Sequence, residues 1–303
     1  MTNTDPRSAI RSIEFGIILK EGEELSYYLV PTDITLKAEF LRMLEQTLSN
    51  WQKGVEVARE YDPAEIYPSR VQLELPSDSL LLGNLSELYN AENIPIEASR
   101  IRELPKLFAY FCIFRTGNTQ NGEKVLAIRK AVQFKGLAKQ RLVRWVDDSL
   151  HYVEDKFFKL DKEFDIVITP TRVMILNPKS FESIARLDDI ILETAGENLV
   201  RMGTHVPFIE LSSLTEYAKT HKRAARLIAS IAARGDLAAT SERLFEEQCT
   251  RCGVTLVCND GRFCPAEKHE LAFLNVLDRR RYVVSLIEDV HEKYEAASRH
   301  GVE

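Results

Sequence analysis

Short strand-like segments that occur in pairs constrain the fold of this chain most strongly. Each pair is rich in β-branched and aromatic residues, and a turn or loop separates its members; the three pairs are 13–19 with 25–30, 107–114 with 125–134, and 164–169 with 172–176. Strands that follow each other across a short connection form hairpins, and hairpins build antiparallel sheets. The sequence therefore predicts antiparallel sheets in both halves of the chain.

Helical patterns alternate with the hairpins. Apolar residues recur at helical spacing over 36–51 and over 181–199. Ser213 and Glu216 stand at the spacing of a capping box, and Gly235 is suited to end the helix that they begin. Separate runs of strands and helices are typical of the α+β class. We therefore predict an α+β fold of two domains, with mainly antiparallel sheets and flanking helices.

Prolines mark the boundary that we expect between the two domains. Five of the eleven prolines lie between residues 61 and 105. Proline lacks a backbone N–H and interrupts both helices and sheets, so this stretch is expected to hold short elements and loops. The predicted domains are an N-terminal α+β domain over 1–105 and a C-terminal α+β domain over 106–303.

The charge balance limits how this chain can hold nucleic acid. It has 40 Lys and Arg residues against 46 Asp and Glu residues, a formal net charge of −6. Binding of nucleic acid through the overall charge of the chain is therefore excluded, whereas binding through a local basic patch is not. No run of about 18 apolar residues is present, and the N-terminus lacks the apolar core of a signal peptide. We therefore expect a cytoplasmic protein.

Basic residues are concentrated in two places. Lys219, Lys222, Arg223 and Arg226 are spaced at i, i+3, i+4 and i+7, which on one continuous helix forms a stripe that can track a phosphate backbone. The segment 121–144 holds seven basic residues and one acidic residue, and its candidates for DNA contact are Lys135, Lys139, Arg141 and Arg144. The competing interpretations are a solvated helix face and an ordinary soluble edge strand.

Four of the five cysteines lie close together near the C-terminal end. Cys249 and Cys252 have the spacing of a zinc knuckle, and Cys258 and Cys264 follow. A zinc ribbon normally closes with a second C-x2-C pair, whereas five residues separate the second pair here. These cysteines also suit the role of small apolar residues around a hairpin that turns at 259–261. We therefore favour packing over zinc binding, and predict no metal and no cofactor.

One short motif raises the possibility of nuclease chemistry. Glu154 and Lys156 have the E-x-K spacing with which some nucleases hold Mg²⁺ and stabilise developing charge. The acidic partner should come from a neighbouring strand upstream, but Asp147 and Asp148 are only six or seven residues away from Glu154. A charged exposed segment is the favoured interpretation, so we lean towards a protein that is not an enzyme.

Motifs in the second half are similar to those of a bacterial family. An F-D-hydrophobic hairpin covers 164–168 and 173–177, and an F-E-x-I helix follows at 181–184. A closing L-N segment lies at 274–277, and the remaining matched residues are Arg281, Tyr282 and Ser285. Over roughly residues 105–290, this pattern resembles the KwaB-like family of the Kiwa anti-phage defence system.

The resemblance implies a DNA-binding effector, largely independent of DNA sequence, that forms a homo-oligomer. It also implies a KwaA-like membrane protein as partner, recruitment from the cytoplasm to the inner membrane, and a block of phage replication or transcription. The matched residues Asp165 and Glu182 are expected to orient backbone or pair with a cation rather than to catalyse. Two other functions stay open: a Mg²⁺-dependent nuclease, and an interaction module that docks an acidic protein or a membrane face.

The interpretation of the cysteines leads to a first prediction. If they pack as apolar residues, the purified protein will contain well under one zinc per chain, and a chelator will leave its melting temperature unchanged, because no structural metal is removed. Elemental analysis and thermal unfolding with and without the chelator measure both effects. A stoichiometric zinc that survives dialysis would contradict the packing interpretation.

Overall fold

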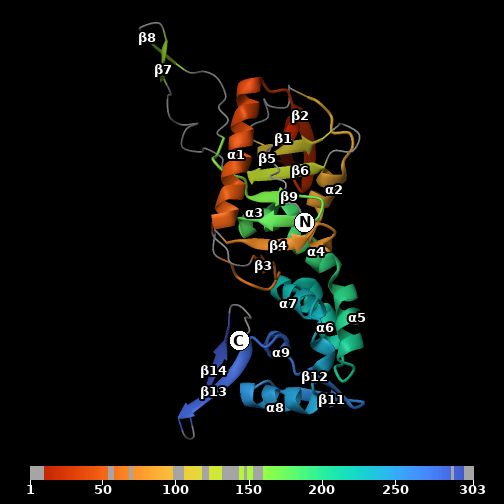
Figure 1. Ribbon diagram of the computed structural model, residues 1–303. Coiled ribbons are helices and arrows are strands. Elements are labelled where there is room, and N and C mark those ends of the chain that lie inside the picture. Colours follow the sequence, from red (N-terminus) through yellow and green to blue (C-terminus); the bar gives the residue numbers. More distant parts are fainter. Residues whose placement is uncertain are drawn as a thin grey trace. The chain divides into compact units, whose positions relative to one another are not determined.

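The computed structural model describes residues 10–53, 58–67, 71–97, 106–117, 123–131, 143–146, 149–152, 160–287 and 290–296. The chain divides into two compact units: unit 1 comprises 1–60 and 69–185, and unit 2 comprises 61–68 and 186–303. Helices and mainly antiparallel strands make up the elements shown in Figure 1, which confirms the predicted α+β class.

Unit 1 is built on an eight-stranded sheet with the strand order β2-β1-β5-β6-β9-β10-β4-β3. Its strands are β1 (Ile10–Glu21), β2 (Glu24–Val30), β3 (Arg59–Glu60), β4 (Leu73–Pro76), β5 (Leu107–Thr116), β6 (Lys124–Lys130), β9 (Ile166–Ile168) and β10 (Arg172–Ile175). Neighbouring strands are antiparallel except β3 and β4, which are parallel. The three predicted hairpins are confirmed as β1–β2, β5–β6 and β9–β10.

Strand pairing in this sheet joins segments that are far apart in the sequence. β1 pairs with β5 from Ile10 opposite Thr116 to Leu19 opposite Leu107, and β4 pairs with β10. Residues on both sides of position 105 therefore share one sheet. The boundary expected between 105 and 106 does not coincide with the division into units, because prolines interrupt local structure but do not decide which strands pair.

The core of unit 1 lies between the sheet and a long helix. Its helices are α1 (Ile34–Lys53), α2 (Asn84–Asn90) and α3 (Pro178–Ala185), with a 3₁₀ turn at Leu80–Leu82. Figure 1 shows α1 running across several strands of the sheet. The ring of Phe40 on α1 stacks on that of Phe15 on β1, with 4.8 Å between the ring centroids, and both side chains are buried. A separate hairpin joins β7 (Val143–Val146) and β8 (Ser149–Tyr152).

Unit 2 is mainly helical. Its helices are α4 (Leu187–Glu193), α5 (Ala195–His205), α6 (Ser212–Thr220), α7 (Lys222–Ala232), α8 (Glu242–Cys252) and α9 (Glu270–Leu277), with a 3₁₀ turn at Leu237–Ala239. Two hairpins complete it: β11 (Leu256–Asn259) with β12 (Arg262–Pro265), and β13 (Arg281–Ile287) with β14 (Val290–Glu295). Helix α7 packs against α4, α5, α6 and α9, and its apolar residues form the centre of this unit.

The helix predicted over 181–199 is wrong as a single element, because α3, α4 and α5 cover that stretch. Arg186 stands between α3 and α4 with a φ of 55°, in the left-handed region that interrupts a helix. Its guanidinium donates to the Asp189 carboxylate at 2.7 Å, within the first turn of α4. The division between the two units falls at the same residue.

The helix predicted from Ser213 to Gly235 is also interrupted. His221 has a φ of −117° and a ψ of 95°, so α6 ends before it and α7 begins after it. The Thr220 hydroxyl donates to the carbonyls of Glu216 and Tyr217, and such local bonds compete with helix continuation.

The predicted helix ends also differ from those observed. The capping box does not form, because α6 begins at Ser212, whose hydroxyl donates to Glu210 at 2.8 Å. At the other end, α7 stops at Ala232, and Gly235 has no positive φ. None of the helices within the described residues combines the length and the apolar character that crossing a membrane requires.

A close approach between β1 and β5 yields a second prediction. Gly16 lies opposite Phe111, and a Cβ atom at Gly16 would stand 2.1 Å from Cζ of that buried ring. We expect Gly16→Ala to destabilise the protein by about 1–3 kcal/mol, because the overlap forces the ring or a strand to move. Thermal unfolding measures the effect.

The matched control is Gly196→Ala on α5, where an added Cβ meets no atom within 4 Å. Alanine favours a helix over glycine by roughly 1 kcal/mol, so this variant should melt at or above the parent temperature. A Gly16→Ala protein that melts like the parent would show that the close packing of β1 on β5 is not required.

Candidate nucleic-acid interface

The four cations expected to form one stripe come from two helices. Lys219 lies on α6, whereas Lys222, Arg223 and Arg226 lie on α7, with the extended residue His221 between the helices. The i to i+7 spacing therefore does not run along a continuous helix, and the expected straight stripe is wrong. The cations instead gather at the junction of α6 and α7 and along the first turns of α7.

Each of these four cations is paired with a carboxylate. The contacts are Lys219 with Glu216 at 2.7 Å, Lys222 with Asp188 at 3.1 Å, Arg223 with Glu295 at 2.6 Å, and Arg226 with Asp188 at 2.8 Å. The side chains of Lys219, Lys222 and Arg223 are 59–62% exposed, whereas that of Arg226 is 22% exposed. Exposed pairs contribute about 0–1 kcal/mol each, so the first three cations can exchange their carboxylates for phosphates.

Arg226 has a structural role that the other three cations do not share. Its Nε and Nη2 atoms both donate to Oδ1 of Asp188, at 3.0 and 2.8 Å, and its Nη1 donates to the carbonyl of Pro63 at 3.3 Å. Burial alone would raise the pKa of Asp188, but the hydrogen bonds from Arg226 and Lys222 outweigh it and lower that pKa below its usual value. Arg226 thus joins α7 to α4 and to the segment 61–68 within unit 2.

A pocket of about 340 Å³ opens beside this cluster, within unit 2. Four of its lining residues are cationic, Lys222, Arg223, Arg226 and Arg280, and two are acidic, Glu65 and Asp188. Arg280 is only 2% exposed and donates to Asp278 at 2.6 Å and to Asp62 at 2.7 Å. The lining therefore holds more cationic than acidic side chains, and each of the four cations is paired with a carboxylate.

Sequence reasoning did not assign a role to several residues of this pocket. Asp188 and Arg280 come from segments far from α7 along the chain, and no spacing rule connects them to it. Asn275, which also lines the pocket, belongs to the L-N motif of the family resemblance, and this was the one available signal. The pocket exists only because α4, α7, α9 and the segment 61–68 pack together.

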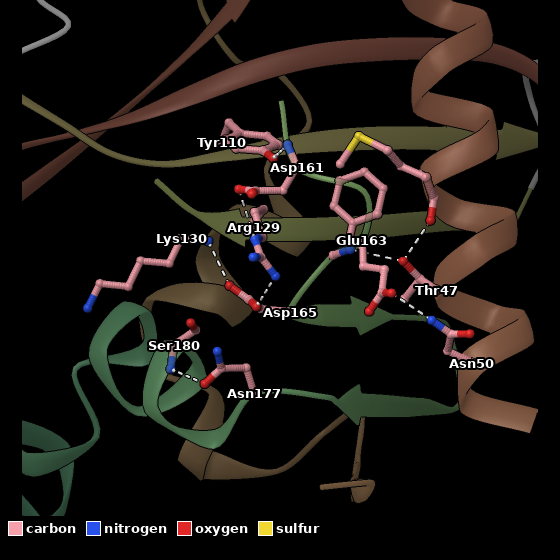
Figure 2. Close-up of polar contacts among 12 residues, drawn as sticks. Thr47, Asn50, Tyr110, Arg129, Lys130, Asp161, Glu163, Asp165, Asn177 and Ser180 are labelled. Atoms are coloured by element: carbon pink, nitrogen blue, oxygen red, sulfur yellow. Dashed lines mark hydrogen bonds and ion pairs between the residues drawn. The ribbon is translucent and has the colours of Figure 1, made fainter. Parts of the chain in front are cut away.

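A second polar network lies inside unit 1, around the F-D motif (Figure 2). Asp165 is 2% exposed; it accepts hydrogen bonds from the Arg129 guanidinium at 2.7 Å and from the backbone N–H of Lys130 at 2.9 Å. Its own backbone carbonyl accepts from Leu176 and Asn177. Asp165 therefore pairs with a cation and orients backbone, as expected from the family resemblance.

Further contacts tie this network into the sheet and to α1. Arg129 also donates to Asp161 at 3.2 Å, and the backbone N–H of Asp161 donates to the Tyr110 hydroxyl at 3.0 Å. On the other side, the hydroxyl of Thr47 on α1 accepts from the N–H of Phe164. Burial raises the pKa of Asp165, although Arg129 and the hydrogen bonds to the carboxylate partly oppose the shift. We interpret this network as structural, because its charged and polar groups form hydrogen bonds with one another inside unit 1.

The other predicted cations fall largely outside the described residues. Lys135, Lys139 and Arg141 lie there, and of Arg144 only the backbone, on β7, is described. The nuclease-like pair Glu154 and Lys156 also lies outside them, together with Asp147 and Asp148. DNA contact by these four cations therefore stays a prediction.

The clustered cysteines differ in their surroundings. Cys249 and Cys252 on α8 and Cys264 on β12 are buried, whereas Cys258 on β11 is exposed. Burial and the neighbouring Cys252 raise the pKa of the Cys249 thiol to about 12, which keeps it protonated. Within the described ranges, no group of three or more His, Cys, Asp or Glu side chains is placed to hold a metal ion.

Comparison with known proteins places these features in one family. A family model described as Kiwa protein KwaB-like matches residues 106–287, more than half of the chain. The matched range includes the Asp165 network, the cations of α6 and α7, and Asn275. No curated protein and no solved structure matches the chain.

The ion pair between Asp188 on α4 and Arg226 on α7 provides the third prediction. We expect Asp188→Asn to destabilise the protein by about 1–2 kcal/mol at pH 7, because Arg226 loses its charged acceptor. The stabilisation from a carboxylate with a lowered pKa is fully present above its unfolded value of about 4 and is lost as the pH falls through the folded value. The deficit of the variant should therefore shrink below about pH 4. Urea unfolding over a pH series measures it.

The control is Asp189→Asn on the same helix, because Asp189 is 45% exposed and its ion pair with Arg186 is local, three residues away in the sequence. It should cost under about 1 kcal/mol. An Asp188→Asn deficit that is absent, or that stays constant with pH, would contradict the role assigned to the Asp188 carboxylate.

Proposed function

The chain belongs to the KwaB-like family of Kiwa proteins, and from this premise we propose that it is a DNA-binding effector. Membership makes it a component of a Kiwa anti-phage defence system, which has several components and therefore implies partner proteins. The proposed action is to bind DNA largely without regard to sequence and thereby to block phage replication or transcription. The proposed partner is a KwaA-like membrane protein that recruits this chain, as a homo-oligomer, from the cytoplasm to the inner membrane.

One observation carries the DNA-binding proposal. Three exposed cations, Lys219, Lys222 and Arg223, lie within five residues of each other where α6 meets α7, and we call them the junction cations. Glu216 and Glu295 are exposed, and half-buried Asp188 keeps Arg226 as a partner when Lys222 leaves it, so exchange of the junction cations for DNA phosphates costs little. Contacts to phosphates position a protein on DNA without reading bases, which supports sequence-independent binding. The overall charge of −6 would limit indiscriminate binding elsewhere on the surface.

The fourth prediction concerns the junction cations. A variant with Lys219→Gln, Lys222→Gln and Arg223→Gln should bind duplex DNA more weakly and about equally so for unrelated sequences, because phosphate contacts are lost. The slope of log affinity against log salt should flatten by roughly 0.9 for each contact removed. Glutamine keeps the helix propensity, and Arg226 is retained because it holds Asp188. Fluorescence anisotropy over a salt series measures the slope.

A charge-matched control replaces three other exposed cations of unit 2, Arg243, Arg251 and Arg262, by glutamine. Both variants lose three positive charges, so an effect of net charge alone would weaken both equally. The proposal requires that only the junction variant flattens the salt slope. If the junction variant melts like the parent and its salt slope is unchanged, the junction cations do not contact DNA. The cations of the 121–144 segment would then be tested next.

The same DNA incubated with Mg²⁺ separates this proposal from the alternatives. Binding without cleavage is the expected result. Mg²⁺-dependent cleavage that Glu154→Ala or Lys156→Ala abolishes would favour the nuclease. Absence of DNA binding, together with binding to anionic vesicles, would favour the interaction module.

A further inference from the structure

Asn275 on α9 is an unusual residue for its surroundings. It is 1% exposed and lies among the buried apolar residues Phe273, Leu274, Val276 and Leu277. Neither its Oδ1 nor its Nδ2 atom has a hydrogen-bond partner among the described residues. A buried amide left without partners costs about 1–3 kcal/mol, which an apolar side chain of similar size would avoid. The cost is removed if a ligand supplies the missing partners.

The position of Asn275 shows where such a ligand would sit. Asn275 is part of the lining of the pocket of about 340 Å³ in unit 2, together with Lys222 and Arg223. This volume falls within the range of small-molecule sites, about 300–1,000 Å³. One lining thus combines a desolvated donor and acceptor with exposed cations. A ligand that pairs with the amide of Asn275 and also with the cations has a neutral hydrogen-bonding edge and an anionic group.

The remaining lining residues narrow the chemical class. Ile66 and Leu227 provide apolar surface on which a flat ring can lie. Arg226 and Arg280 are already held by carboxylates in this structure, which leaves Lys222 and Arg223 as the exposed cations of the lining. A nucleotide combines these features, because its base has a donor and an acceptor on one edge and its sugar carries a phosphate. Asn is suited to an adenine edge, because its Nδ2 can donate to N7 while its Oδ1 accepts from the N6 amino group.

We propose that this pocket binds an adenine mononucleotide, with Asn275 contacting the base and Lys222 and Arg223 contacting the phosphate. This site overlaps with the phosphate contacts proposed for duplex DNA but adds Asn275 and the pocket, and it does not depend on the chain binding DNA. Because Lys222 and Arg223 take part in both proposals, a bound nucleotide would compete with DNA for these two cations.

Isothermal titration with AMP, UMP, adenosine and inorganic phosphate tests the proposal. We expect AMP to bind most tightly, since only AMP offers both the adenine edge and the phosphate. Asn275→Leu should weaken AMP binding at least tenfold and yet leave the protein as stable as the parent or more so, because an unsatisfied buried amide is removed. A purely structural asparagine would give the opposite result for stability.

Ser230→Ala is the matched control. Ser230 on α7 is also buried, its hydroxyl also has no partner among the described residues, and it is not among the residues lining the pocket. This variant should bind AMP like the parent. Equal weakening in both variants would overturn the assignment of Asn275.

Two further outcomes would overturn the proposal: no binding of AMP at millimolar concentration, or equal binding of AMP and inorganic phosphate that Asn275→Leu leaves unchanged. The latter would indicate a simple anion site. Duplex DNA binding by Asn275→Leu should equal that of the parent, so failure of the nucleotide proposal is distinguishable from failure of the DNA-binding proposal.

Discussion

Eight of the eleven residues of α7 are buried, and the helix packs against α4, α5, α6 and α9. The cationic side chains of α7 therefore lie on the side of the helix that is not buried, where Asp188 of α4 pairs with Lys222 and Arg226. A carboxylate in that position reduces repulsion between neighbouring cations and fixes α7 to α4. The pocket, the junction cations and the position of Asn275 all follow from how α7 is held.

Unit 1 depends in a similar way on one buried carboxylate. Asp165 joins β6, β9 and the start of α3 through contacts with Arg129, Lys130 and Asn177. Burying a charge is expensive, and the expense is offset only when all its hydrogen-bonding capacity is used. Removing Arg129 would take the ion-pair partner from a carboxylate that is almost fully buried, which costs more than replacing both residues by apolar ones. The network therefore explains, without any catalytic role, why an F-D pair stands at this hairpin.

The charged residues of this family member thus divide by burial rather than by type. Arg129, Arg226 and Arg280 are largely buried and bound to carboxylates that join separate elements, whereas Lys222 and Arg223 have exposed head groups that a phosphate can reach. A net negative chain can then contact anions at one place without attracting them everywhere. The proposed DNA contacts and the proposed nucleotide site draw on the same two exposed cations, so each would limit the other.

The sequence by itself determined the hairpins, the α+β class, the long helix over 36–51 and the family, because these depend on local spacing and on short motifs. It did not determine that β1 pairs with β5, nor that the predicted helix after Ser213 breaks at His221. Strand partners and helix breaks are decided by which apolar surfaces are buried together, and this involves residues distant along the chain. For the same reason Asp188, Arg280 and Asn275 meet in one pocket only in the folded protein: no local pattern records a contact that tertiary packing creates.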